Sequence, residues 1–257
     1  MSNESLLTLM KVLLIDAFNL IRRIFEARSD SDLESVVTAS TQSSQRALRE
    51  HEPSHVVMVF EKHDRTWRHL LYRDYKANRS PTPEVLLGGV DAFVAGFKEI
   101  GINSFALESY EADDVIATFA AGVAQAGNQA IILSSDKMYL QLLSRHIRVA
   151  NHFTHQFLEE SDVEQRYGVG VAQLKDYWSL VGDSSNNIKG VPGIGPKTAV
   201  TLLGQYHSLD RMLSEQGDDK VLKKVQENEH LAIRCKQLVT LKTDVGLGTN
   251  LRSFRMG

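Results

Sequence analysis

The stretch Val12-Leu-Leu-Ile15, followed directly by Asp16, has the composition of a buried β-strand that ends on a carboxylate. Three more short apolar runs share this character along the first half of the chain. The four candidate strands cover residues 12–15, 56–60, 102–107 and 130–133. Segments of helical periodicity alternate with them, at residues 32–50, 83–99 and 112–125. This alternation predicts an α/β fold, with a mainly parallel sheet flanked by helices.

The strand signal fades after about Tyr167, and the rest of the chain has the periodicity of helices. We expect these at residues 171–181, 197–206, 219–228 and 229–241. The sequence therefore predicts an α/β core over residues 1–167 and a helical region over residues 168–257. No long flexible linker separates the two, so we expect them to pack together. Residues 62–82 within the core are polar, basic and poorly periodic, as in a long functional or disordered loop.

Bulk composition excludes several classes of protein. The chain has 257 residues, 42% of them hydrophobic and 24% charged, which is typical of a globular protein. Cys235 is the only cysteine, which excludes an internal disulfide and a cysteine-based zinc site. No apolar run is long enough to span a bilayer, and the first five residues lack the basic character of a signal peptide. We therefore expect a cytoplasmic monomer with no membrane partner.

Charge is unevenly distributed, although the net charge is only −3. Between residues 61 and 79 there are six basic and three acidic residues. The basic ones are Lys62, Arg65, Arg68, Arg73, Lys76 and Arg79, and the acidic ones are Glu61, Asp64 and Asp74. Separate basic segments for a nucleic-acid backbone and carboxylates for cations are what a metal-dependent phosphodiesterase requires.

Acidic residues follow the predicted strands, at the edge of a parallel sheet where ligands bind. Asp16, Glu61 and Asp136 stand at or just after strand ends, and Glu111-Ala-Asp113-Asp114 opens a predicted helix. Residues two apart do not share a helix face, so Glu111 and Asp113 can share an ion only if Glu111 lies at or before the N-cap. Asp114 would then point away.

Several carboxylates together suit Mg²⁺ or Mn²⁺, which in phosphodiester hydrolysis generate hydroxide and stabilise the charge of the transition state. Each acid taken alone could equally cap a helix or close a strand.

The stretch Gly190-Val-Pro-Gly-Ile-Gly-Pro-Lys197-Thr-Ala predicts a glycine turn that leads into a helix. Free backbone N–H groups and the positive end of the helix dipole make such a turn a phosphate site. Any DNA contact there would be to the backbone and blind to sequence. The alternative is a connector that uses its glycines for tight packing.

These blocks together resemble the 5′-nuclease or flap-endonuclease family, which includes the nuclease portion of bacterial DNA polymerase I. The resemblance runs from Leu13-Leu-Ile-Asp16 to Leu241-Lys-Thr-Asp244. The specific blocks are Trp67-Arg68 with Tyr75-Lys76-Ala-Asn-Arg79-Ser-Pro-Thr-Pro, Glu111-Ala-Asp-Asp114, Ser135-Asp136-Lys137 with Gln141-Leu-Leu143, and Gly182-Asp183 with the glycine turn. The size of the chain and the lack of a polymerase are similar to the stand-alone exonuclease IX-type flap endonucleases. The resemblance implies a PIN-like nuclease core.

For the metal sites, the resemblance implies a first cluster of Asp16, Glu61, Glu111, Asp113 and Asp136. Glu61 stands where the family usually has Asp. The family's second cluster falls on Met138, Asp183 and Asn186, of which only Asp183 keeps a carboxylate. The resemblance therefore implies one Mg²⁺ or Mn²⁺ ion, bound chiefly through Asp113, and a weak second ion.

For DNA, the resemblance places Arg68, Lys76 and Arg79 in an arch, residues 62–82, which clamps a single-stranded 5′ end and contacts the scissile phosphate. Trp67 and Tyr75 either stack on a base or pin the loop.

The glycine turn resembles the family's helix–hairpin–helix, residues 183–205, which holds K⁺ on main-chain carbonyls and grips duplex DNA. The carbonyls would be those of Leu180, Val181, Lys189, Val191 and Ile194. The DNA-binding residues would be Gly193, Ile194, Gly195, Pro196, Lys197 and Thr198.

The function implied is structure-specific cleavage of 5′ flaps in branched DNA during replication or repair. Two alternatives remain open at this stage. Because Met138 and Asn186 replace acids, the chain could be a non-catalytic DNA-structure-binding protein with a decayed site. A ribonuclease on the same core is less attractive, because the hairpin suits duplex DNA.

Overall fold

The main sheet is mixed and almost entirely parallel. In the computed structural model, which describes residues 9–28, 32–62 and 65–257, it has six strands in the order β3-β2-β1-β4-β5-β6. Their bounds are β1 Lys11–Asp16, β2 His55–Glu61, β3 Asn103–Leu107, β4 Gln129–Leu133, β5 Ile147–Asn151 and β6 Gln156–Leu158. All pairings are parallel except that of β5 with β6. The predicted α/β fold is therefore confirmed.

Register in the sheet places the candidate carboxylates at one edge. Asp16, the last residue of β1, pairs with Val59 of β2. Glu61, the last residue of β2, pairs with Leu107 at the end of β3. Because parallel strands all end on the same side, both acids reach the carboxyl edge, where crevices form in such sheets.

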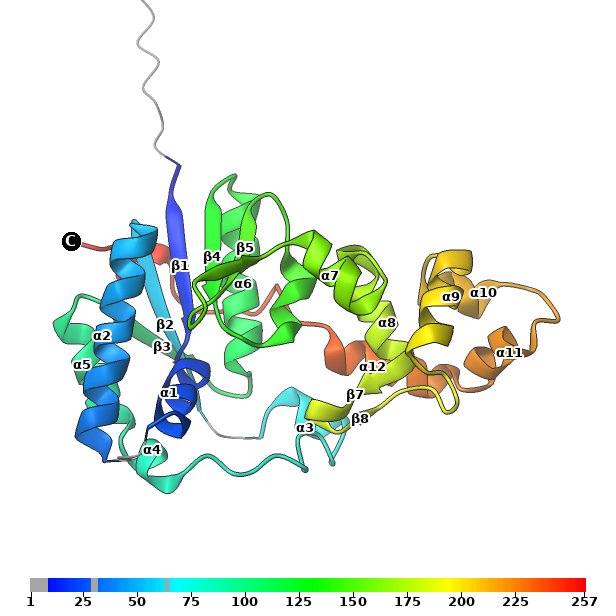
Figure 1. The fold of residues 1–257 in the computed structure, drawn as a ribbon, viewed down its shortest axis with the longest axis horizontal. Coiled ribbons are helices and arrows are strands. Elements are labelled where there is room, and N and C mark those ends of the chain that lie inside the picture. The colour runs from blue at the N-terminus through cyan, green and yellow to red at the C-terminus, as the bar shows by residue number, and fades with distance from the viewer. Residues whose placement is uncertain (1–8, 29–31, 63–64) are drawn as a thin grey trace, which may run out of the picture.

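Helices cover both faces of the sheet (Figure 1). Helices α1, α2 and α5 lie on one side and α6 on the other. The helices of this half are α1 Ala17–Glu26, α2 Leu33–His51, α3 Trp67–Leu71, α4 Glu84–Gly88, α5 Val90–Glu99, α6 Ala112–Gln125 and α7 Glu160–Tyr167. The strands alternate their side chains between the faces, so that Leu13 and Ile15 pack toward α1 while Val12 and Leu14 pack toward α6.

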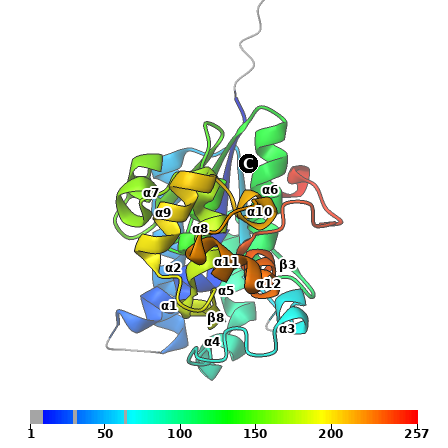
Figure 2. The same cartoon turned by 90° about the vertical axis from the view of Figure 1, so that its right-hand side faces the viewer.

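The C-terminal region is helical and continues one of these two cores (Figure 2). Its elements are α8 Leu174–Val181, β7 Gly182–Asp183, β8 Ile188–Lys189, α9 Pro196–Tyr206, α10 Leu209–Ser214, α11 Lys220–Glu227 and α12 Glu229–Val239. Short 3₁₀ turns complete the chain: η1 Lys137–Leu142, η2 Val171–Gln173, η3 Ser184–Asn186 and η4 Leu251–Phe254. Ile116 of α6 and Trp178 of α8 belong to one continuous hydrophobic cluster. The two regions therefore pack together, as expected.

Some elements differ from the sequence prediction. The helix expected over residues 83–99 is two helices, α4 and α5, divided at Gly89, where a Cβ atom would lie 2.3 Å from Leu33 Cδ1. Strands β5 and β6 were not predicted. The segment 62–82, expected to be a loop, contains α3, and its residues 63–64 lie outside the described residues. Within the described ranges, no helix combines the length and the apolarity that crossing a membrane requires.

Candidate active site

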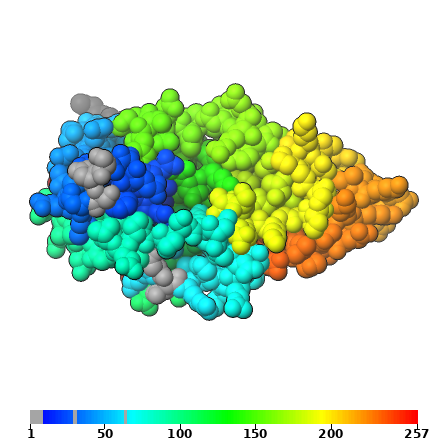
Figure 3. Space-filling view, turned by 60° about the horizontal axis from the view of Figure 1, so that its bottom comes forward, coloured from blue at the N-terminus to red at the C-terminus, as the bar shows by residue number. Residues whose placement is uncertain are grey.

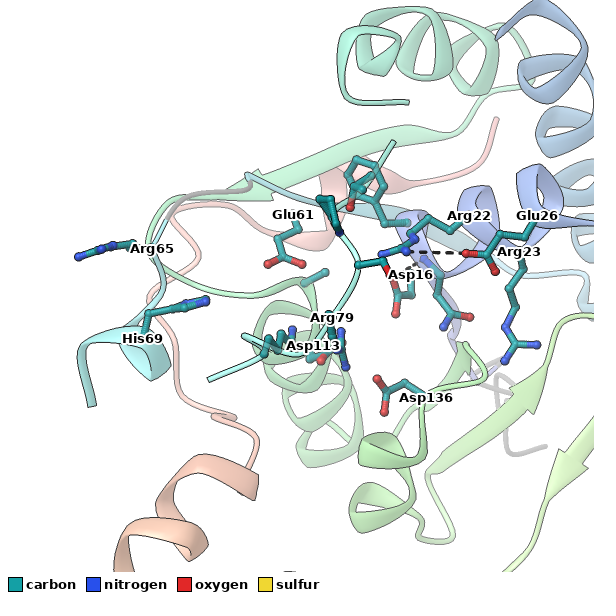
Figure 4. Close-up of a pocket in the computed structure, with 17 residues that line it drawn as sticks. Asp16, Arg22, Arg23, Glu26, Glu61, Arg65, His69, Arg79, Asp113 and Asp136 are labelled. Atoms are coloured by element: carbon teal, nitrogen blue, oxygen red, sulfur yellow. Dashed lines mark hydrogen bonds and ion pairs between the residues drawn. The ribbon is translucent and has the colours of Figure 1, made fainter. Parts of the chain in front are cut away.

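Four carboxylates from four elements line one cavity. Asp16 ends β1, Glu61 ends β2, Asp113 lies in the first turn of α6, and Asp136 is the N-cap of η1. The cavity has a volume of about 560 Å³, and Figure 4 shows these side chains around a shared space. Residues up to 120 positions apart in the chain thus meet at the carboxyl edge of the sheet, as the strand-end pattern predicted.

Burial and mutual repulsion raise the pKa values of two of these acids. Burial, together with the nearby Asp136 and Glu61 carboxylates, raises the pKa of Asp16 to about 6. Removal from water raises the pKa of Asp113 well above its usual range, and Asp136 and Asp16 add to the effect. A bound cation would stabilise the ionised carboxylates, so this set of hard oxygen ligands fits a divalent ion.

Hydroxyl groups behind the carboxylates fix their orientation. The Tyr139 hydroxyl donates to Asp113 Oδ1 at 2.8 Å and lies 3.4 Å from Asp16 Oδ2. The Ser134 hydroxyl donates to Asp16 Oδ2 at 3.1 Å. Hydrogen bonds of this kind hold metal ligands in place. Sequence reasoning missed both residues. Ser134 follows β4 directly and gave a weak signal, whereas nothing in the sequence marks Tyr139.

Glu111 is the N-cap of α6, with extended backbone angles of φ −78° and ψ 156°, so this expectation is confirmed. Its carboxylate, however, is 1% exposed and does not line the cavity. Arg68 Nη1 donates to Oε2 at 2.8 Å, the Tyr75 hydroxyl donates to the same oxygen at 3.0 Å, and Lys76 Nζ binds Oε1. These three donors turn Glu111 toward Lys76 rather than toward an ion.

Lys76 and Arg79 place positive charge on the wall of the cavity that faces the acids. Burial alone would lower the pKa of Lys76, but the Glu111 carboxylate raises it above its ordinary value, so the amine stays charged. Arg79 is held by Ser185 O at 3.1 Å from Nε and by Asn186 Oδ1 at 2.6 Å from Nη2. Figure 4 shows Arg79 among the side chains that line the space.

Arg68 does not occupy the position expected for a phosphate-contacting residue. Its side chain is 1% exposed and lies outside the cavity lining. It forms a two-point ion pair with Asp114 and also donates to the Leu238 and Thr240 carbonyls. Every side of the guanidinium is thus used within the protein, and the group joins the start of α6 to the end of α12.

The two aromatic residues in this segment pin the loop instead of presenting a free face. Trp67 Nε1 donates to Asp114 Oδ2 at 2.8 Å, and the Arg68 guanidinium lies 4.4 Å from its ring centroid. Tyr75 is 4% exposed, with its hydroxyl on Glu111. Of the two explanations left open by the sequence, loop anchoring is the one the geometry favours.

Asp183, the remaining acid of the expected second cluster, lies apart from the cavity lining and is 2% exposed. Lys137 Nζ contacts its Oδ1 at 2.6 Å, and the Asn186 amide donates to its Oδ2 at 2.6 Å. Met138 is buried in the hydrophobic core. Over residues 9–28, 32–62 and 65–257, no group of three or more His, Cys, Asp or Glu side chains is arranged to hold a metal ion by itself. The four cavity carboxylates are therefore an open arrangement, in which water and a phosphate would complete the coordination of an ion.

The glycine turn brings two backbone segments into close contact. A Cβ atom on Gly182 would lie 2.5 Å from Gly190 N, and one on Gly190 would lie 2.3 Å from Leu180 O. The carbonyls of Leu180 and Val191 accept hydrogen bonds from Val191 N at 2.8 Å and Ile194 N at 3.1 Å. Of the residues expected to bind K⁺, Leu180, Val181 and Lys189 lie at this contact, Val191 is hydrogen-bonded to Leu180, and Ile194 is hydrogen-bonded to Val191.

Helix α9 begins directly after the turn, with Gly195 as N-cap and Pro196 in its first turn. Gly193, Gly195 and Lys197 are exposed, whereas Ile194 is 6% exposed and anchors the turn in the core. Figure 3 shows the face on which the N-terminal helix (blue), the segment after β2 (cyan) and the hairpin (yellow) surround residues that follow β4 (green). The hairpin and the segment that follows β4 therefore appear on the same face of the molecule.

Comparison with known proteins gives a consistent picture over the whole chain. Residues 11–168 match the 5′-3′ exonuclease N-terminal resolvase-like domain, and residues 169–257 match the 5′-3′ exonuclease C-terminal SAM fold. The chain is 41% identical over 252 residues to the flap endonuclease Xni of Psychromonas ingrahamii, covering 95% of this chain and 96% of the relative. It is 42% identical over 248 residues to the flap endonuclease Xni of Vibrio campbellii, covering 95% of each.

Solved structures share the fold at low sequence identity. The T5 5′-exonuclease with bound zinc ions superposes with a TM-score of 0.73 at 20% identity, covering 91% of this chain and 90% of that one. The catalytic core of Rad2 in complex with DNA gives a TM-score of 0.58 at 15% identity, covering 96% of this chain and 83% of that one.

Proposed function

This chain belongs to the 5′-3′ exonuclease family, and we propose that it is a flap endonuclease that hydrolyses a phosphodiester bond in branched DNA carrying a 5′ flap. The observation that carries the proposal is the cavity in which Asp16, Glu61, Asp113 and Asp136 face Lys76 and Arg79. Such an arrangement provides ligands for a cation and positive charge for a phosphate in the same space.

The divalent site consists of the four cavity carboxylates, with Asp113 and Asp16 oriented by the Tyr139 hydroxyl. A bound Mg²⁺ or Mn²⁺ ion supplies Lewis acidity and lowers the pKa of water. The chain itself brings the carboxylates to one cavity, where a bound cation would favour their ionised forms, and it leaves the solvent side of the cavity open for a phosphate. Because Glu111 is fully engaged with its three donors, its role is to position Lys76.

Lys76 and Arg79 stabilise the negative charge that develops on the phosphate during cleavage. Both are fixed before substrate arrives, Lys76 by Glu111 and Arg79 by Ser185 and Asn186. Preorganised charge of this kind acts without further rearrangement at the moment of reaction.

Duplex DNA binds at the helix–hairpin–helix, residues 183–205, within the helical part of the chain. Exposed Gly193 and Gly195 allow the phosphate backbone to approach the N–H groups at the start of α9. A K⁺ ion on the carbonyls around the Gly182 and Gly190 contact would link protein to a phosphate oxygen. Replacing K⁺ by tetramethylammonium at constant ionic strength should weaken duplex binding and leave Mn²⁺ affinity unchanged. We propose that the protein acts as a monomer, in the cytoplasm, on branched DNA.

The test is cleavage of a 5′-flap oligonucleotide in Mg²⁺ by the wild-type chain and by Asp113→Asn. We expect cleavage by the wild type and its loss in the variant, while Asp91→Asn, an exposed change on α5, retains it. Binding of the flap by the wild type without cleavage would favour the non-catalytic alternative. A matched substrate with an RNA flap tests the ribonuclease alternative, which predicts that the RNA flap is cleaved in preference to the DNA flap.

A further inference from the structure

Asp183 is already surrounded by donors from its own chain. Its Oδ1 accepts from Lys137 Nζ at 2.6 Å, from the Ser185 hydroxyl at 2.7 Å and from Ser185 N at 3.1 Å. Its Oδ2 accepts from Asn186 Nδ2 at 2.6 Å. A carboxylate has about four favourable lone-pair positions, so these contacts use nearly all of them.

Asn186 extends this set of contacts to the active-site cavity. While its amide nitrogen donates to Asp183, its Oδ1 accepts from Arg79 Nη2 at 2.6 Å. The result is a continuous polar chain, Lys137–Asp183–Asn186–Arg79, with a fixed positive charge at each end. An aspartate at position 186 could not donate to Asp183, so the neutral amide is what allows the chain to be continuous.

We infer that this polar chain takes the place of a second divalent ion, with the Lys137 ammonium as the resident cation on Asp183. The inference rests on the proposed nuclease function, since it concerns how many ions that site holds. Lys137 is a positioning residue: it neutralises Asp183, which holds Asn186, which in turn holds Arg79 against the cavity.

The surroundings of Asp183 do not fit a second ion. The Asp183 carboxylate has no exposed surface. Met138, which stands where the resemblance places a further acid, lies in the hydrophobic core. A divalent ion would have to displace the Lys137 ammonium and the Ser185 and Asn186 donors at the same time. In the wild type the Lys137 ammonium is therefore what closes the site to a second ion, and removing it would free an Asp183 oxygen and the Ser185 hydroxyl as hard oxygen ligands.

The experiment counts bound ions directly, by electron paramagnetic resonance titration of the full chain with Mn²⁺. We expect one ion on the wild type and none on Asp113→Asn. In Lys137→Met, which leaves the Asp183 charge without its ammonium, a second ion should appear at Mn²⁺ concentrations where the wild type still holds one. Lys98→Met, an exposed change on α5, is the matched control and should retain one ion.

Two results would overturn the inference. One is a wild type that binds two ions and loses one of them in Asp183→Asn. The other is a Lys137→Met protein that folds, as judged by its circular dichroism, and still binds only one ion. If Lys137→Met does not fold, the Asp183→Asn arm decides alone, since we expect that change to leave the ion count at one.

The same titration separates this inference from the proposed function. Two ions together with flap cleavage would remove the inference and leave the nuclease intact. Absence of both Mn²⁺ binding and cleavage would remove the nuclease itself.

Discussion

Arg68 and Asp114 form a two-point ion pair in the protein interior, with Nη1 2.6 Å from Oδ2 and Nη2 2.9 Å from Oδ1. Both side chains are at most 1% exposed. The pair joins the segment after β2 to the first turn of α6, and Arg68 also reaches the Leu238 and Thr240 carbonyls. It therefore connects the nuclease core to the end of α12 while standing outside the cavity.

Removing Arg68 should destabilise the protein by about 3–5 kcal/mol, because Asp114 is left as a buried charge without its counter-charge. Arg68→Ala is compared with the wild type by urea unfolding, with Arg73→Ala, an exposed residue outside the cavity lining, as control. A normal unfolding free energy together with a large loss of cleavage would show that Arg68 acts on the substrate instead.

Tyr139→Phe should weaken divalent binding about 10-fold or more, since loss of the hydroxyl frees Asp113 and Asp16 to rotate. The measurement is Mn²⁺ affinity, with Tyr72→Phe as a control for removal of a tyrosine hydroxyl elsewhere. Unchanged affinity in Tyr139→Phe would mean that the hydroxyl has no part in orienting the carboxylates.

Lys76→Met should slow cleavage of a bound flap by roughly 10²-fold, because a fixed charge beside the phosphate is lost. Single-turnover rates measure this step apart from substrate binding. Lys62→Met is the matched control, because Lys62 lies in the same segment but pairs at the surface with Glu108. Equal rates for the two variants would exclude Lys76 from charge stabilisation.

His152 should make stability depend on pH between about 6.5 and 4. Burial lowers the pKa of His152 to about 4, and its Nε2 lies 2.6 Å from the Ser43 hydroxyl, with His51, His155, Glu50 and Arg46 nearby. The folded state favours the neutral ring, so stability is full above the unfolded pKa of about 6.5 and declines as the pH falls toward 4.

From pH 7 to pH 5, the wild type should lose about 2 kcal/mol more than His152→Gln. Urea unfolding at the two pH values measures the difference, and the exposed His230→Gln should behave as the wild type does. Equal losses in all three proteins would show that His152 is protonated in the folded state.

The sequence predicted the elements whose pattern is local. Helix α6 spans residues 112–125 as expected, and the four predicted strands are present. The spacing of apolar residues and the residue types at a helix start both depend on residues that are close in the sequence. The strand-end rule also predicted that Asp16, Glu61 and Asp136 would share an edge. The sequence pattern missed the short strands β5 and β6, and it missed α3, because a five-residue helix leaves almost no periodic signal.

Partners of individual side chains could not be predicted in the same way. Arg68, Glu111 and Asp183 were each assigned from a resemblance, but what they contact is set by residues far away in the chain. Arg68 meets a carbonyl 170 positions later, and Asp183 meets a lysine 46 positions earlier. Such pairings depend on how the α/β core and the helical region pack, which no local pattern encodes.

The most direct test of the account is anomalous diffraction at the manganese edge from a crystal soaked in Mn²⁺. We predict a peak in the cavity between Asp16, Glu61, Asp113 and Asp136, and none at Asp183 beside Lys137. A peak at Asp183, with the four-carboxylate cavity empty, would contradict the account.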